Sequence, residues 1–85
     1  MGSYELRIKP SAAKELEALP FDDRQRVVRR IQGLREDARP RGCEKLTGGS
    51  RYRVRQGDFR VLYEVDDATR VVTVVKIGNR RDVYR

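Results

Sequence analysis

Histidine is absent from this 85-residue chain, and cysteine occurs only once, as Cys43. The absence of histidine excludes a ribonuclease that uses a pair of histidines, and it excludes a histidine-ligated metal site. The carboxylates show no spacing typical of metal ligands, so we expect neither a metal nor another cofactor. A single cysteine forms no internal disulfide, and nothing indicates an oxidising compartment.

Long apolar runs are also missing. No segment is long enough to predict a membrane span, and residues 1–5 lack the apolar core of a signal peptide. We therefore expect a cytoplasmic protein with no membrane partner. The length suits one domain with a modest core, and we place that single domain at residues 1–85.

Positive charge is abundant. Twenty Lys and Arg residues stand against thirteen Asp and Glu residues, which gives a net charge of +7 and a sequence pI near 10.2. This balance favours a polyanionic partner, but it fits a ribosomal protein, a DNA-binding protein and a nuclease alike. Most of the cations are arginines, whose planar fork of donors matches a phosphate group, so the bias indicates phosphate recognition.

The order of the elements predicts an α+β fold. Residues 4–8 alternate and predict a strand, and two amphipathic helices follow. We expect Ser11 to cap the first helix, and Asp22 with Gln25 to form a capping box at the second. The segments 51–56, 59–66 and 71–77 then predict strands of an antiparallel meander. The result is a strand, a two-helix hairpin and a three-stranded meander, with the helices packed on one face of a four-stranded sheet.

The hairpin around Gly57-Asp58 concentrates the positive charge. A two-residue turn there places Arg55 opposite Arg60 and Val54 opposite Val61. Because side chains alternate across a sheet, the apolar face belongs on the helices. The opposite face collects Arg51, Arg53, Arg55 and Arg60 with Leu62 and Glu64. Such a face fits a phosphate cradle, and the alternative is a solvated face that protects a sheet edge.

Three segments resemble RelE-like toxins of bacterial type II toxin–antitoxin systems, in the RelE/ParE superfamily. The central motif runs from Tyr52 to Val65, the C-terminal motif Gly-Asn-Arg-Arg-Asp-Val-Tyr-Arg occupies residues 78–85, and residues 9–16 are similar more weakly. Together they span nearly the whole chain. The resemblance implies a RelE-like fold, with the same order of elements as the pattern of the sequence predicts.

The resemblance also implies an activity, namely cleavage of mRNA in the A site of the 30S ribosomal subunit. Family members use basic hairpin residues, an arginine after the last strand and a C-terminal tyrosine. By motif position these catalytic residues are Arg53, Arg55, Arg60, Arg80 and Tyr84. Arg81 is the alternative to Arg80, and Arg51, Arg81 and Arg85 are expected to contact RNA. The chain departs from the pattern in having arginine, which does not lose its proton, where well-known relatives have lysine, so the general base stays open.

Two other functions remain open. ParE-like members of the superfamily act on DNA gyrase without the nuclease residues, and a non-catalytic RNA- or ribosome-binding module would share the basic charge. The resemblance further implies an acidic antitoxin that is encoded nearby. It implies that the toxin contacts operator DNA only indirectly, as part of the toxin–antitoxin complex. For the nuclease, the RNA 2′-OH is the nucleophile, and no metal is needed.

Overall fold

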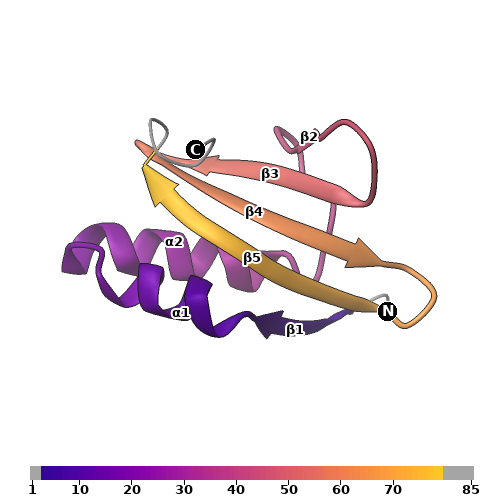
Figure 1. Ribbon diagram of the computed structural model, residues 1–85, viewed down its shortest axis with the longest axis horizontal. Coiled ribbons are helices and arrows are strands. Elements are labelled where there is room, and N and C mark those ends of the chain that lie inside the picture. The colour runs from indigo at the N-terminus through magenta and orange to yellow at the C-terminus, as the bar shows by residue number, and fades with distance from the viewer. Residues whose placement is uncertain (1–2, 80–85) are drawn as a thin grey trace.

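The computed structural model of the chain describes residues 3–79. Within that range the elements follow the order β1 (Glu5–Ile8), α1 (Pro10–Glu17), α2 (Phe21–Gly33), β2 (Glu44–Lys45), β3 (Arg51–Gln56), β4 (Phe59–Asp66) and β5 (Val71–Asn79). Figure 1 shows the two helices side by side on one side of the sheet. The expected α+β fold, with a helical hairpin packed on one face of a sheet, is confirmed.

The sheet is mixed and has the strand order β1-β5-β4-β3-β2. Strand β1 pairs in parallel with β5, and the pairs β5–β4, β4–β3 and β3–β2 are antiparallel. Four strands were expected, whereas the described part of the chain contains five. The additional strand, β2, has only two residues, both exposed and polar. A strand this short carries no detectable alternation, so the sequence pattern could not reveal it.

The core lies between the helices and the inward face of the sheet. Val27 and Ile31 of α2 are buried there, together with Val54, Val61 and Tyr63 of the hairpin. Val72 and Val74 of β5 complete this layer, in keeping with a central strand. Ala12 of α1 is also buried there and Leu16 packs against the core, so both amphipathic helices turn their apolar sides to the sheet. Burial of each large aliphatic side chain contributes roughly 1.5–3 kcal/mol.

The helix starts differ from the expectation. Helix α1 begins at Pro10 with Lys9 at the N-cap, and α2 begins at Phe21 with Pro20 at the N-cap. Neither N-cap residue makes a side-chain capping hydrogen bond. Proline suits the first helical position because its missing N–H would have no helical partner, so Pro10 takes that position and Ser11 lies inside the helix. Asp22 lies in the first turn of α2, where its charge favours the helix dipole.

Candidate functional site

The β3–β4 hairpin turns its arginines away from the helices. Gly57 adopts a φ of +60°, as the first residue of a tight two-residue hairpin turn requires. The register pairs Arg55 with Arg60 and Val54 with Val61, so the predicted hairpin is confirmed. Both valines are fully buried against the core. Arg51, Arg53, Arg55 and Arg60 therefore share the opposite surface, which we call the cationic face.

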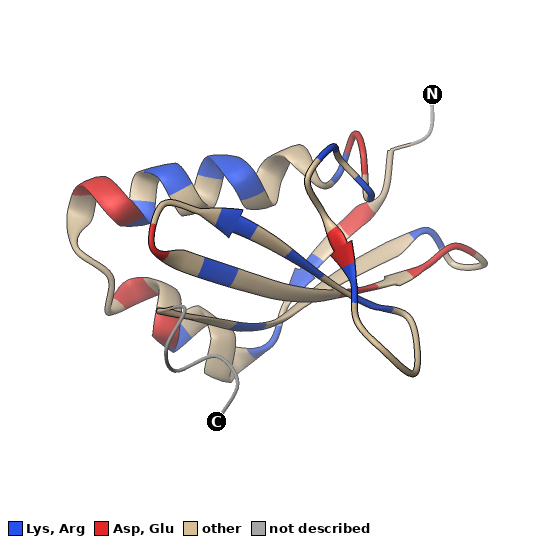
Figure 2. Ribbon diagram, turned by 90° about the horizontal axis from the view of Figure 1, so that it is seen from above, with Lys and Arg blue, Asp and Glu red and all other residues tan. Residues whose placement is uncertain are grey.

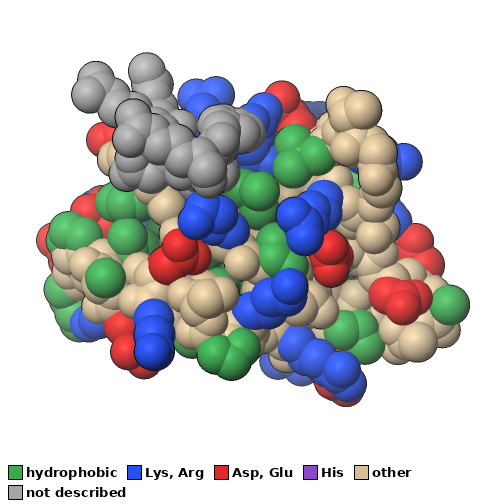
Figure 3. All heavy atoms as spheres, in the orientation of Figure 1, with side chains coloured by type: hydrophobic (Ala, Val, Ile, Leu, Met, Phe, Trp, Pro, Cys, Tyr) green, Lys and Arg blue, Asp and Glu red, His purple; other side chains and the backbone are tan. Residues whose placement is uncertain are grey.

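A buried apolar side chain lies within the cationic face. Leu62 is only 7% exposed, although it points away from the core and does not belong to the main core cluster. Around it, Arg53 and Arg60 are half-buried, whereas Arg51 and Arg55 are exposed. Figure 3 shows basic side chains spread over this side of the molecule, with acidic side chains among them. The cationic face thus combines four arginines, two of them partly buried, with a buried apolar side chain.

Two carboxylates lie among these arginines. Glu64 lies 2.9 Å from Arg51, and Glu44 of β2 lies 2.8 Å from Arg53. The hydrogen bond and charge of Arg53 lower the pKa of Glu44, and the charges of Arg55 and Arg60 lower it further. Glu44 is therefore an ionised carboxylate at neutral pH, within the electrostatic field of three arginines. Its place here depends on β2 pairing with β3, which the sequence did not predict.

Lys76 extends the basic surface onto β5. It pairs with Leu62 in the β4–β5 ladder, and its Nζ lies 3.1 Å from Oε2 of Glu15 in α1. The other oxygen of Glu15 accepts the backbone N–H of Ile77 at 2.9 Å. Strand β1 pairs with β5 only as far as Val74, so among the described residues the edge of β5 beyond Val74 has no partner strand there. Glu15 provides the acceptor for the backbone N–H of Ile77 on this edge. Lys76 was not among the predicted site residues.

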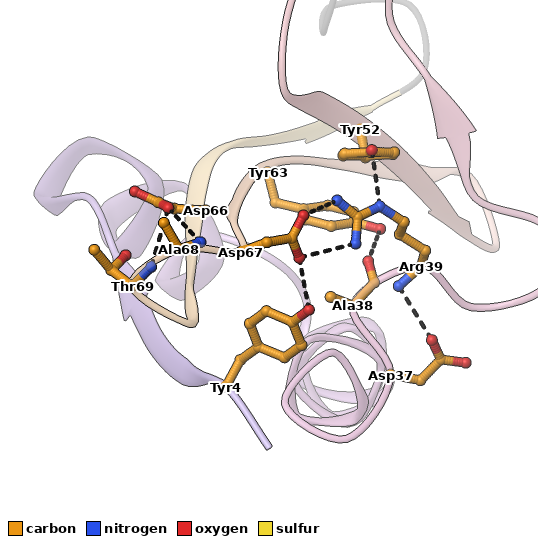
Figure 4. A network of polar contacts seen from close by, with 10 residues as sticks. All are labelled: Tyr4, Asp37, Ala38, Arg39, Tyr52, Tyr63, Asp66, Asp67, Ala68 and Thr69. Atoms are coloured by element: carbon orange, nitrogen blue, oxygen red, sulfur yellow. Dashed lines mark hydrogen bonds and ion pairs between the residues drawn. The ribbon is translucent and has the colours of Figure 1, made fainter. Parts of the chain in front are cut away.

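The loop that leads to β2 is fixed by a polar network (Figure 4). Arg39 donates to both carboxylate oxygens of Asp67, at 3.2 and 2.8 Å, and its Nε donates to the hydroxyl of Tyr52 at 2.8 Å. Tyr4 donates to Asp67 at 2.8 Å. These contacts lower the pKa of Asp67 to about 2, and the hydrogen bond from Arg39 has the largest effect. The network ties residues before β2 to the sheet and so restricts where Glu44 can lie.

Several predicted site residues lie outside the described residues: Arg80, Arg81, Tyr84 and Arg85. The described chain ends at Asn79, which pairs with Phe59 beside the hairpin turn. Between residues 3 and 79, no three His, Cys, Asp or Glu side chains gather as a metal site would require. The helices in this range are too short or too polar to cross a membrane.

Comparison with known proteins agrees with this geometry. Residues 6–84 match the model of a family described as the ParE toxin of the type II toxin–antitoxin system parDE. Toxin RelG of Mycobacterium tuberculosis is 29% identical over 84 residues, covering 96% of this chain and 97% of RelG.

Solved structures of RelE proteins have the same fold. RelE in the archaeal RelE–RelB complex of Pyrococcus horikoshii superposes with a TM-score of 0.84 at 29% identity, over 95% of this chain and 99% of that one. The toxin–antitoxin complex RelBE2 of M. tuberculosis gives 0.81 at 25% identity, over 92% and 99%. Because the family match extends over nearly the whole chain and the fold agrees, this chain belongs to the ParE toxin family within the RelE/ParE superfamily and is the toxin of a type II toxin–antitoxin system.

Proposed function

We propose that this toxin is a ribosome-dependent endoribonuclease that cuts mRNA in the ribosomal A site. The observation that carries the proposal is the cationic face, where Arg53, Arg55 and Arg60 surround a buried Leu62 beside the carboxylate of Glu44. A group of arginines on one surface suits a phosphate that gains charge in the transition state. Because mRNA is translated in the cytoplasm, we propose that the toxin acts there.

The chemistry needs few groups because RNA supplies its own nucleophile. The 2′-OH attacks the adjacent phosphorus in line, the 5′ oxygen leaves, and a 2′,3′-cyclic phosphate and a 5′-hydroxyl result. Arg55 and Arg60 would bind the nonbridging oxygens and stabilise the pentacoordinate transition state. The ribosome would supply much of the alignment of the strand, which is worth several kcal/mol in well-oriented reactions.

Proton transfer requires a group other than arginine, which stays protonated. Glu44 is an exposed carboxylate that lies 2.8 Å from Arg53, beside the arginines that would bind the phosphate, so we assign it the role of proton acceptor from the 2′-OH. Tyr84 is the proposed proton donor to the leaving oxygen, and Arg80, with Arg81 as its alternative, is a further phosphate ligand. Arg51 and Arg85 would bind flanking RNA. None of these steps uses a metal.

An antitoxin would control this activity. The Pyrococcus and M. tuberculosis relatives were solved as complexes of toxin with antitoxin. The net charge of +7 favours an acidic segment that folds on binding. We propose that the antitoxin is encoded beside the toxin gene and that the complex, rather than the toxin alone, contacts operator DNA.

A ParE-like action on DNA gyrase is the second candidate, because the matching family is described by the parDE system. In vitro translation with the purified toxin, followed by primer extension on the mRNA, tests the first candidate. Cuts at fixed codon positions, present only with translating ribosomes, support it. Intact mRNA together with DNA linearised in a gyrase reaction supports the second candidate. Inhibited translation without cuts or DNA damage would favour a non-catalytic ribosome-binding module.

A further inference from the structure

A hollow of about 400 Å³ lies between α2 and the turn end of β3. Three arginines of α2, Arg26, Arg29 and Arg30, line it, together with Gly33, Pro40 and Gln56. The arginines follow the i, i+3, i+4 spacing of one helix face, so their side chains emerge side by side. Figure 2 shows the basic positions of α2 on the helix that runs beside the β3–β4 hairpin.

The hollow is electrostatically unbalanced. No acidic residue is among the described residues that line it. Within the described part of the chain, Asp23 places its carboxylate 3.9 Å from Arg26. Nε of Arg30 is buried and has no hydrogen-bond partner within the described part of the chain. Like charges three and four residues apart on one helix face repel each other and destabilise the helix. An anion bound in the hollow would relieve this repulsion.

The hollow and the cationic face share strand β3. Gln56 lines the hollow, and its neighbour Arg55 lies on the cationic face. Strand β2 pairs only with Tyr52 and Arg53 of β3. In the described structure, the part of β3 nearest the turn therefore has no strand on its outer side. This uncovered stretch of β3 lies between Arg55 and the hollow.

We propose that this hollow is a second RNA-binding site, which holds backbone phosphates of the same RNA strand that the cationic face binds. The proposal rests on the proposed nuclease function and extends it from one scissile phosphate to a path over two surfaces. Arginine forks bind phosphate oxygens in pairs, which suits a chain of phosphates. An amphipathic protein helix would need an apolar lining, and here Gly33 and Pro40 alone are apolar.

Salt dependence measures this contact directly. The fluorescence anisotropy of a labelled single-stranded RNA gives the dissociation constant over a series of salt concentrations. Each phosphate contact to a single strand contributes about 0.7 to the slope of log affinity against log salt. Removing two contacts with Arg26→Gln/Arg29→Gln should make this negative slope shallower by about 1.4. The control Arg7→Gln/Arg35→Gln removes the same charge from exposed positions away from the hollow, and its slope should match that of the wild type.

The outcomes separate this site from the nuclease proposal. If the Arg26→Gln/Arg29→Gln variant (the hollow variant) and the control variant have equal slopes, the second RNA-binding site is overturned. This outcome includes the case in which the hollow binds an acidic polypeptide instead of RNA. In ribosomal cleavage, the hollow variant should need more protein for half-maximal cutting and keep its single-turnover rate at saturation. If the wild type cuts no mRNA but the salt dependence of RNA binding is still shallower for the hollow variant than for the wild type, the second RNA-binding site stands and the nuclease proposal fails.

Discussion

Arg55 and Arg60 face each other directly across the β3–β4 ladder, on the side turned away from the core. Two like charges in opposed positions of a sheet are destabilising, by a few tenths of a kcal/mol up to about 1 kcal/mol. Carboxylates lie on the same face, since Arg51 contacts Glu64 and Arg53 contacts Glu44. Because folding places Arg55 and Arg60 directly opposite each other, this end of the face suits an anionic ligand that both guanidinium groups can bind.

Replacing Arg60 tests this role. Arg60→Gln keeps a polar side chain of moderate length and removes the charge, so cleavage of mRNA on ribosomes should fall about 10²–10³-fold, the effect of losing one stabilising donor in a transition state. The free energy of unfolding should change little, because the variant also removes repulsion with Arg55. Arg7→Gln on β1 is the matched control and should cleave at the wild-type rate. Full activity of Arg60→Gln would contradict the phosphate-binding role.

The two acids of the cationic face should behave differently. Glu44→Gln removes the proposed proton acceptor, so the single-turnover rate should fall about 10²–10⁴-fold. Glu64→Gln removes a carboxylate that pairs with Arg51, and its rate should stay within a few-fold of the wild type. Faster cleavage by Glu44→Gln would mean that Glu44 competes with the phosphate for Arg53 and that another group accepts the proton.

Tyr84→Phe separates proton transfer from stacking on a base. Phenylalanine retains the aromatic surface and lacks the ionisable hydroxyl, so ribosome binding should be kept while the chemical step slows by about 10²-fold or more. Pre-steady-state cleavage at saturating toxin measures the chemical step, and co-sedimentation with ribosomes measures binding. An unchanged rate would limit Tyr84 to stacking or packing.

The hairpin was predictable because its information is local. Gly57-Asp58 fixes the turn, and alternation then fixes which face each arginine occupies. Glu44 was not predictable in this way, since its position depends on a two-residue strand with exposed polar side chains. The hollow beside α2 was also missed. It arises where a helix packs near a strand end, and the sequence does not specify the distance between Arg30 and Gln56.

The helix caps show a different limit. Ser11 and Asp22 are good capping residues in isolation, but Pro10 and Pro20 determine where the helices start. Proline has a fixed φ and no N–H, which favours a helix boundary more strongly than a side-chain cap. Here two local preferences competed, and the backbone constraint was the stronger one.

Tyr63 supports the loop before β2 from inside the core. Its ring is fully buried, and its hydroxyl donates to the carbonyl of Ala38 at 2.7 Å. Burial raises the pKa of Tyr63, so the hydroxyl keeps its proton as a donor. Tyr63→Phe should lower the free energy of unfolding by about 1–3 kcal/mol, the cost of a buried acceptor without a partner. Urea unfolding measures this loss, and a change below about 0.5 kcal/mol would mean that water or another donor replaces the hydroxyl.

Asp67 should make the stability of the fold depend on pH in the acid range. Its pKa is about 2 in the folded protein against an ordinary value of 3.8, because Arg39 and then Tyr4 stabilise the carboxylate. A carboxyl whose pKa is depressed on folding stabilises the protein above its unfolded pKa, and this stabilisation disappears as pH falls from about 4 to about 2. Asp67→Asn should therefore show a weaker decline of the urea midpoint over that range than the wild type. Arg39→Gln should remove most of the same dependence, and adding it to Asp67→Asn should remove little more, because both residues belong to one interaction. If Asp67→Asn follows the wild-type curve between pH 4 and 2, other carboxyls dominate the acid response, and the contact between Arg39 and Asp67 contributes little to stability in solution.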